Sequence, residues 1–187
     1  MRFSDFPLLA ELQRAAAGSG YLTPTPVQAG AIPALMHGSD VLALAQTGSG
    51  KTAAYVLPLL HQVQATQRRS PRPVHALVLL PTRELAMQVG TVVRDMARFL
   101  RDGPKIAVVF GGVSANPQMM RLRGGADVVV ATPGRLLDLV ASNAVSLSAL
   151  RLLVLDEADR LLDAGFADEL ERVLALLPDR RQTAMLS

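Results

Sequence analysis

Cysteine is absent from this sequence of 187 residues, and lysine is nearly so. Without cysteine the chain has neither disulfides nor thiolate metal ligands. Its three histidines, His37, His61 and His75, are scattered and lack the spacing of a metal site, so structural zinc is not expected. Only Lys51 and Lys105 are lysines among 19 basic residues. We give this preference for arginine no functional weight, because abundant alanine and leucine indicate a bias of base composition.

Long hydrophobic runs are also missing. Hydrophobic residues make up 50% of the chain and the mean hydropathy is +0.28, which argues against disorder, but polar residues interrupt each apolar stretch before it could cross a bilayer. The first residues show no signal-peptide pattern. We therefore expect one soluble, cytoplasmic domain of ordinary size. The net charge of +3 permits a polyanionic partner without requiring one.

Six apolar, β-like runs appear after residue 40. The first five are each followed by an amphipathic or helix-prone stretch, which is the pattern of parallel strands with crossover helices. Runs that are apolar almost throughout, such as 76–80 and 152–155, predict a sheet covered by helices on both faces. We therefore predict an α/β fold, with ligands at the carboxyl ends of the strands. The six predicted strands are 41–45, 74–80, 105–110, 127–131, 151–156 and 182–187.

Residues 1–40 have a different character. Helical patterns over 8–17 and 27–36 are separated by a loop rich in glycine, threonine and proline, so we predict an N-terminal element packed on the same domain as residues 41–187. The segment 68–73 is a basic, proline-broken turn, and an exposed connection is favoured there over a binding site. The sequence contains no internal repeats.

A glycine loop lies between the first predicted strand and the helix predicted after it. Glycines let consecutive backbone N–H groups surround an anion, and the start of the helix adds partial positive charge. Lys51 can reach the outer phosphates of a nucleotide, and Thr52 can offer its hydroxyl to Mg²⁺. Ala45 stands where the general phosphate-loop pattern has glycine, and a plain strand-to-helix turn is the alternative. The predicted nucleotide-binding residues of the loop are Gln46, Thr47, Gly48, Ser49, Gly50, Lys51 and Thr52.

An acidic cluster follows the apolar run 152–155. The three carboxylates of Asp156, Glu157 and Asp159 would repel one another, but a bound Mg²⁺ reverses that electrostatic balance. Asp156 is the predicted metal partner, acting through water, and Glu157 is suited to orient or deprotonate an attacking water. The alternative is that these acids only cap the helix that contains Arg160.

These two motifs and four further segments resemble the first RecA-like domain of DEAD-box RNA helicases, over essentially the whole chain. The tetrapeptide that names the family stands here at 156–159, and Ala45 is what the family normally carries in its phosphate loop. The resemblance implies a RecA-like P-loop NTPase fold, ATP or ADP with Mg²⁺ as cofactors, and RNA as partner. The four further segments are 20–28, 81–86, 111–112 and 132–135.

Three of these segments carry the family's RNA contacts. Each places threonine, glycine or arginine at the predicted start of a helix, where N–H groups and arginine can hold phosphates without reading base edges. RNA binding should therefore be independent of base sequence. Taken singly, each residue is more often a helix cap, a turn or a surface charge. The residues carried over are Pro81, Thr82, Arg83, Gly111, Gly112, Thr132, Pro133, Gly134 and Arg135.

Residues 20–28 resemble the family's Q motif, which reads adenine. The resemblance assigns the adenine edge to the Gln28 amide, which can both donate and accept, and the face of the base to Tyr21. Phe3 stands where the family has an upstream aromatic that supports this site, and Thr23 belongs to the same motif. ATP should therefore be preferred over GTP. Core packing of the two rings and a surface position for Gln28 are the alternatives.

Residues 182–187 resemble the strand that leads into the family's Ser-Ala-Thr motif. We expect the second RecA-like domain, which in the family supplies transition-state arginines, to be missing, and loss of such an arginine costs on the order of 10³ to 10⁵ in rate. The fragment is therefore expected to be a monomer that binds adenine nucleotide but hydrolyses it barely and does not unwind RNA. The resemblance gives catalytic roles to Lys51, Asp156, Glu157 and Asp159, the last coupling the site to the other domain.

Two further functions stay open beside an RNA helicase. The lobe could belong to a nucleotide-gated RNA clamp, in which hydrolysis is only a release signal, and a strand-displacement assay would separate the two. A DNA-directed helicase or another P-loop ATPase is the other possibility, against which the segment 20–28 argues. Backbone contacts carry no base information, so neither RNA target nor pathway follows from the sequence.

Overall fold

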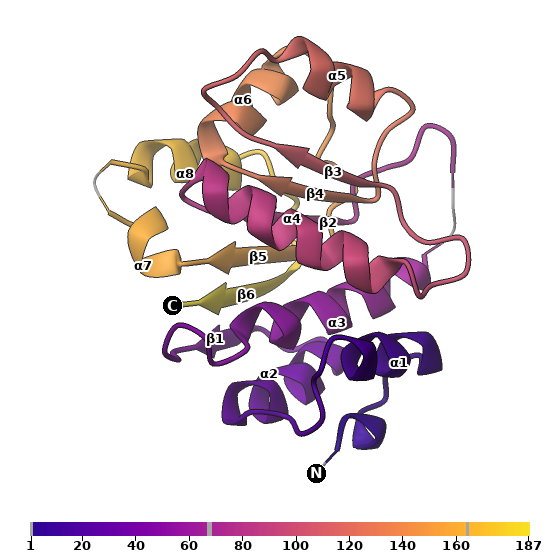
Figure 1. Cartoon of the computed structure of the whole chain (residues 1–187). Coiled ribbons are helices and arrows are strands. Elements are labelled where there is room, and N and C mark those ends of the chain that lie inside the picture. Colours follow the sequence, from indigo (N-terminus) through magenta and orange to yellow (C-terminus); the bar gives the residue numbers. More distant parts are fainter. Residues whose placement is uncertain (1, 67–68, 164) are drawn as a thin grey trace.

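A sheet of six parallel strands forms the centre of the described chain, which comprises residues 2–66, 69–163 and 165–187 of the computed structural model (Figure 1). All six strands predicted from the apolar runs are present, and each neighbouring pair is parallel. Their order across the sheet is β1-β6-β5-β2-β4-β3. The strands are β1 Val41–Ala43, β2 Ala76–Leu79, β3 Ile106–Val109, β4 Val128–Ala131, β5 Leu152–Asp156 and β6 Gln182–Leu186.

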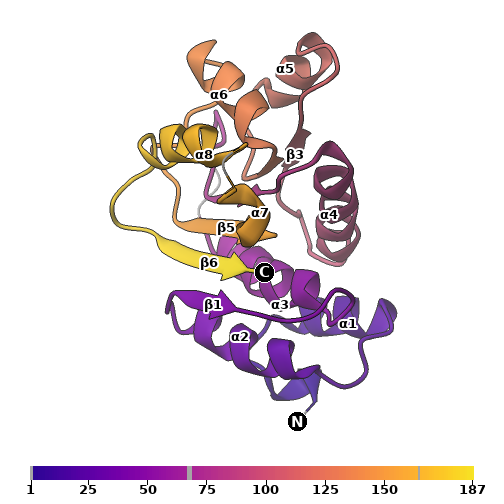
Figure 2. The same cartoon turned by 90° about the vertical axis from the view of Figure 1, so that its left-hand side faces the viewer.

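Helices cover both faces of this sheet, as predicted. Helices α1 to α4 share one apolar cluster with alternate residues of β2, such as Ala76 and Val78, whereas α5 to α8 share a second cluster with Leu77 and Leu79 (Figures 1 and 2). This alternation is the two-residue period of a strand buried on both sides. The helices are α1 Ala10–Gly18, α2 Pro26–Met36, α3 Lys51–Gln64, α4 Arg83–Ala97, α5 Asn116–Leu122, α6 Pro133–Ala141, α7 Ala158–Leu161 and α8 Ala167–Leu174, with a short 3₁₀ turn η1 at Phe3–Asp5.

Several strands are shorter than the apolar runs that predict them. The run 74–80 contains the four-residue strand β2, although Val74 and Leu80 at its ends remain buried. The Leu80 amide still donates to the Ala131 carbonyl, but Pro81 has no N–H with which to continue the ladder. Hydrophobicity therefore marks burial, and the first proline marks the end of pairing.

The N-terminal element packs on the same face of the sheet as α3 and α4. Phe6, Leu12 and Ile32 from this element are buried in one apolar cluster with α3. Polar contacts add to that packing, because the Leu9 amide donates to His61 Nδ1 of α3 at 3.2 Å. No helix within the described ranges has the length and apolar character needed to cross a membrane.

Strand β6 lies between β5 and the edge strand β1. β1 pairs with β6 alone in the described sheet, from Val41 opposite Ala184 to Ala43 opposite Leu186. Two further bonds extend this pairing toward the glycine loop, since Ser187 N donates to Ala43 O and Ala45 N donates to Ser187 O, both at 3.0 Å. The start of the phosphate loop is thereby fixed to the tip of β6.

The basic turn predicted at 68–73 falls partly outside the described residues, since 68 is not among them. Arg69 and Ser70 are exposed, as an exposed connection requires. Arg72 instead pairs with the buried carboxylate of Asp127 at 2.5 Å, so it anchors the turn to the start of β4.

Candidate functional site

The glycine loop follows β1 at the carboxyl edge of the sheet, toward which Figure 2 looks. Gly48 and Gly50 have φ values of +80° and +88°, a region that other residues enter only with strain. The amides of Gly48, Gly50 and Thr52 have no protein partner in the described part of the chain, and Ser49 Oγ is buried without one. Unbonded donors that converge on one loop suit a phosphate group.

Lys51 opens α3 directly after this loop. Its ammonium group curls back and donates to the Ala45 carbonyl at 2.6 Å. The side chain is half-buried, and its bond to Ala45 holds the ammonium group at the start of the loop. A phosphate at the loop would compete with a neutral carbonyl for this charged donor, and charge-assisted bonds are about twice as strong as neutral ones.

Gln28 reaches the same loop from the N-terminal element. Its Oε1 accepts from the Thr25 amide at 3.0 Å, and its Nε2 donates to the Gly50 carbonyl at 3.1 Å. With Thr25 it forms a capping box at the start of α2, and the side chain is fully buried. The alternative of a surface position for Gln28 is therefore wrong, while its contact with adenine stays a prediction. Its direct bond to the phosphate loop was not foreseen.

The two aromatic rings predicted at the adenine site lie together. Phe3 is 5% exposed and sits edge-on to Phe6 with centroids 5.7 Å apart, and the half-buried ring of Tyr21 lies 6.1 Å from it. Thr23 is exposed. Core packing accounts for Phe3, whereas Tyr21 keeps an accessible side. Whether it covers a base stays a prediction.

Asp156 ends β5 and is bonded at both carboxylate oxygens. Its Oδ1 accepts from the Glu157 amide at 3.0 Å, and its Oδ2 accepts from the buried Tyr55 hydroxyl of α3 at 2.7 Å. Burial raises the pKa of Asp156, and burial beside Asp156 raises the pKa of Tyr55. Tyr55 was not among the predicted site residues because its position in α3 reads as ordinary core.

Glu157 and Asp159 follow at the tip of the same strand. Glu157 adopts left-handed backbone angles of φ 51° and ψ 52°, uncommon for a residue with a side chain, and its carboxylate pairs with Arg160 at 2.8 Å. Asp159 is exposed, and its amide donates to Ser187 Oγ at 3.3 Å. A hydrogen bond with Ser187 lowers the pKa of Asp159. Glu157 is the N-cap residue of α7 and Asp159 lies in its first turn, so the catalytic roles of these two acids stay a prediction.

The residues present fit a magnesium nucleotide. Thr52 and Asp156 both offer hard oxygen ligands, and the Tyr55 hydroxyl interacts with each of them. Among the described residues no cluster of three or more acidic or histidine side chains forms a cage for a metal.

A groove of about 440 Å³ lies beside this corner, at the ends of β2, β3 and β4. Eight of the nine residues predicted to contact RNA line it, and the ninth, Thr82, caps α4 by accepting from the Leu85 amide at 3.3 Å. The sheet order, which places β2, β4 and β3 side by side, brings these distant segments together. The eight are Pro81, Arg83, Gly111, Gly112, Thr132, Pro133, Gly134 and Arg135.

The two arginines of this groove behave differently. Arg83 is exposed and lies over the Phe110 ring, 5.1 Å from its centroid. Arg135 is buried, and its Nη2 donates to the Val113 carbonyl at 2.7 Å, so it supports the loop after Gly112. Glu169 of α8 also lines the groove; no local motif marked it. Arg83 is the freer of the two for an anionic strand.

Comparisons with known proteins agree with this geometry. Residues 25–187 match the family described as DEAD/DEAH box helicase. The chain is 44% identical to "ATP-dependent RNA helicase DeaD" of Haemophilus influenzae over 99% of its own length and 29% of the relative's. It is also 44% identical to "Probable ATP-dependent RNA helicase ddx27" of Dictyostelium discoideum over 99% of this chain and 23% of that protein. It thus spans about a third or less of these relatives.

A solved structure supports the same relationship. The crystal structure of a DEAD box protein from the hyperthermophile Methanococcus jannaschii superimposes with a TM-score of 0.89 and 32% sequence identity, covering the whole of this chain and 50% of that one. The fold is therefore the RecA-like fold predicted from the sequence. With the family match covering most of its length, the chain belongs to the DEAD/DEAH box helicase family.

Proposed function

We propose that this chain is the ATP-binding lobe of an ATP-dependent RNA helicase that locally unwinds or remodels RNA duplexes. The observation that carries the proposal is the convergence of the glycine loop at 46–52 with Asp156 and Glu157, beside a groove lined by the predicted RNA contacts. The relatives' printed names, which specify ATP and RNA, support it.

In the nucleotide site, Lys51 would donate to the outer phosphates after leaving the Ala45 carbonyl. Thr52 and Asp156 would hold Mg²⁺, which supplies positive charge that neutralises the phosphate oxygens. Tyr55 fixes the Asp156 carboxylate on the helix side. Glu157 would orient the attacking water or accept its proton, and Asp159 would couple the site to a second RecA-like domain.

The adenine site would be formed by Gln28, Tyr21, Phe3 and Thr23. The Gln28 amide has one further N–H and one further lone pair beyond its bonds to Thr25 and Gly50. Adenine presents a donor and an acceptor in the order that an amide can match, whereas guanine does not. We therefore propose a preference for ATP over GTP.

RNA would bind across the groove through its backbone, with Arg83 and the helix N-termini contacting phosphates. This chain covers 29% and 23% of the two relatives, so we propose that a second domain closes on ATP and RNA to bend the strand and separate a short duplex. Alone, this lobe would be a cytoplasmic monomer that binds nucleotide and hydrolyses it barely.

A nucleotide-gated RNA clamp is the second candidate function. The groove and nucleotide site are adjacent, which suits gating equally well. Strand displacement by a protein that includes the second domain separates the two, because a clamp retains RNA without releasing the complementary strand of a short duplex.

Calorimetry of the folded chain with ADP, ATP and GTP tests the proposal. We expect heat of binding for the adenine nucleotides with Mg²⁺ and a weaker response to GTP. In the two-domain protein, Glu157→Gln should retain ATP binding and abolish RNA-stimulated hydrolysis. Absence of adenine-nucleotide binding at millimolar concentration would contradict the proposed function. Normal hydrolysis by the variant would show that Glu157 does not activate the attacking water.

A further inference from the structure

The opposite, amino-terminal edge of the sheet carries two adjoining cavities that the nucleotide and RNA sites do not use. One measures about 600 Å³ and the other about 890 Å³, and they share Pro71, Pro73, Ser148 and Ala149 in their walls. The sheet strands are four or five residues long at β2 and β5, so this edge lies roughly 15 Å from the carboxyl edge. The cavities therefore form a separate surface.

The smaller cavity is strongly basic. Arg69, Arg151 and Arg180 line it, all three are exposed, and none forms an ion pair or side-chain hydrogen bond within the described ranges. No acidic residue lines this cavity among the described residues, although Asp179 is the chain neighbour of Arg180. Three unpaired guanidinium groups around one hollow favour an anion with several oxygens.

His75 lies in the wall of the same cavity. It is 8% exposed, and neither ring nitrogen has a hydrogen-bond partner of good geometry in the described part of the chain, although the Ala149 carbonyl lies nearby. Burial lowers the pKa of His75, and Arg151 and Arg69 act in the same direction, whereas the Ala149 carbonyl and Asp127 act against it. A neutral imidazole presents one N–H donor and one acceptor. Both ring nitrogens are inaccessible, so His75 forms part of the cavity wall and leaves ligand contacts to the three exposed arginines.

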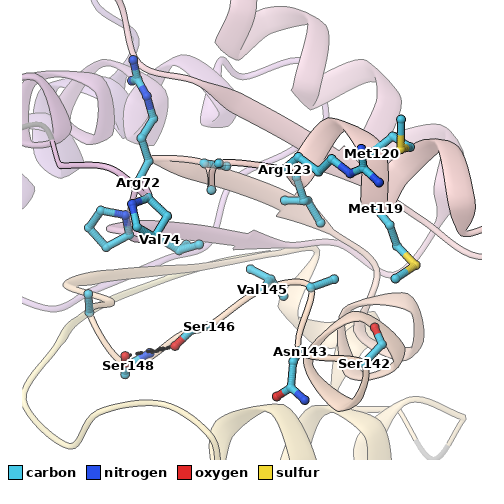
Figure 3. Close-up of a pocket in the computed structure, with 18 of the residues that line it drawn as sticks. Arg72, Val74, Met119, Met120, Arg123, Ser142, Asn143, Val145, Ser146 and Ser148 are labelled. Atoms are coloured by element: carbon cyan, nitrogen blue, oxygen red, sulfur yellow. Dashed lines mark hydrogen bonds between the residues drawn. The ribbon is translucent and has the colours of Figure 1, made fainter.

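The larger cavity adjoins the basic one and has an apolar floor. Figure 3 shows it between the α5 side, with Met119, Met120 and Arg123, and the loop that carries Asn143 and Val145. Methionine is flexible and polarizable, and it packs well against flat rings. Asn143, at φ 55°, lies in the loop that forms the opposite wall.

We propose that this amino-terminal edge is a second, sequence-independent RNA contact. Arg69, Arg151 and Arg180 bind consecutive phosphates, and an adjacent base enters the methionine-lined hollow. The proposal rests on RNA as the polymer of the proposed function, but it uses none of the residues of the carboxyl edge. It would hold a flanking strand while the other edge works on a duplex.

RNA fits this surface better than an acidic peptide does. Guanidinium groups bind carboxylates as well as phosphates, so the basic cavity alone does not discriminate. The adjoining hollow discriminates between RNA and an acidic peptide, because a base has a flat, apolar face that aspartate and glutamate side chains lack. The basic pI of about 9.9 agrees with a polyanionic partner.

Fluorescence anisotropy with a labelled ten-nucleotide single-stranded oligouridylate tests the contact. The triple variant Arg69→Gln, Arg151→Gln, Arg180→Gln should bind roughly tenfold or more weakly, and the slope of log affinity against log salt should fall by about 2, at roughly 0.7 for each phosphate contact. The matched control makes the same charge change at exposed arginines that line neither cavity. These control positions are Arg2, Arg14 and Arg172.

Equal weakening by both triple variants, or by neither, would overturn the proposal. A site-resolved measurement distinguishes its failure from failure of the proposed function. In amide NMR spectra of the wild-type chain, the same oligouridylate should shift His75 and Arg151 as well as Arg83. Shifts confined to Arg83 would refute the second contact alone, whereas shifts at none of the three would also refute RNA binding by this lobe.

Two further titrations identify the ligand. If tripolyphosphate or hexaglutamate shifts His75 and Arg151 while the oligouridylate does not, the occupant is a small phosphate compound or an acidic protein segment, and RNA is wrong. If the oligouridylate shifts both residues and the small anions do not, the strand occupies this surface as proposed.

Discussion

The N-terminal element and the sheet both hold the phosphate loop, but by different means. The sheet holds it through a backbone ladder, in which the Ala45 amide donates to the Ser187 carbonyl and the Ser187 amide donates to the Ala43 carbonyl of β1. The N-terminal element holds it through one side chain, since Gln28 donates to the Gly50 carbonyl. A ladder changes little with its surroundings, whereas a side-chain bond can be exchanged for a ligand. The adjustable half of the nucleotide site is therefore the N-terminal half.

Replacement of Lys51 by alanine has the largest expected effect on nucleotide binding. Lys51 donates to Ala45, the loop residue that is held by the sheet. Loss of the charged donor should weaken ATP binding by about 100-fold or more, since truncating one partner of a buried charged pair costs roughly 2–5 kcal/mol. Calorimetry measures the change. Lys105→Ala is the matched control, because Lys105 is the other lysine of the chain and donates to the Arg123 carbonyl away from the loop. Equal losses in both variants would contradict the assignment.

Gly50→Ala tests the contact between the phosphate loop and Gln28 of the N-terminal element. A Cβ there would overlap Gln28 Nε2, and the φ of +88° adds strain of about 1–2 kcal/mol. We expect ATP binding roughly tenfold weaker and a lower melting temperature. Gly48→Ala is the control, since it has a similar φ of +80° but nothing within 4 Å of its Cβ, and should show the strain alone.

The same two glycines can test whether the Gln28 contact stabilises the phosphate loop. If Gln28 holds the loop from the N-terminal side, the double variant Gln28→Ala, Gly50→Ala should recover part of the stability lost in Gly50→Ala, because the overlap is removed. Equal melting temperatures for Gly48→Ala and Gly50→Ala would mean that the Gln28 contact has no energetic role.

Tyr55→Phe tests the other polar bond of the site. Removal of the hydroxyl leaves Oδ2 of the buried Asp156 without its donor, which should lower stability by about 1–3 kcal/mol and weaken binding of magnesium nucleotide a few-fold. Urea denaturation and calorimetry give the two values. Tyr21→Phe is the control, because Tyr21 is the other tyrosine and its hydroxyl has no hydrogen bond among the described residues. Unchanged stability in Tyr55→Phe would contradict the positioning role.

The smallest expected effect is a pH dependence on the N-terminal side. Burial lowers the pKa of His61, whose Nδ1 accepts from the Leu9 amide. Since the folded-state pKa lies below the unfolded value of about 6.5, the unfolded state binds the proton more readily. This contribution to stability is therefore complete above that value and is lost as the pH falls below it.

His61→Gln separates this contribution from that of His75, which shifts in the same direction. Glutamine can still accept from the Leu9 amide but does not titrate between pH 5 and 8. The difference in unfolding free energy between wild type and variant should therefore change between pH 7 and 5, by less than about 1 kcal/mol. A difference that is constant over this range would show that His61 does not titrate on folding.

Local patterns sufficed for the elements of the fold and for the phosphate loop. Strand β2 is apolar throughout and β5 is apolar up to Asp156 because both faces of the sheet are buried, and this burial is visible in the sequence. The glycines at 48 and 50 and the acids at 156–159 are adjacent in the chain, so their chemistry could be read without knowing the fold.

Contacts between distant segments could not be predicted in this way. Tyr55 and Asp156 are 101 residues apart, and nothing in an apolar helix distinguishes a tyrosine that bonds a carboxylate from one that only fills space. The basic edge was equally hidden, because Arg69, Arg151 and Arg180 meet only through the strand order. Burial of Gln28 depends likewise on how α2 docks against the loop.

The position of β6 has a consequence for how the protein is made. The edge strand β1 pairs only with β6 in the described sheet, and β6 is the last of the six strands in chain order. During synthesis on the ribosome, domains fold as their residues emerge from the N-terminus. The phosphate loop therefore cannot reach its final place until residues 182–187 have left the exit tunnel, and a nascent chain shorter than this should not yet retain nucleotide.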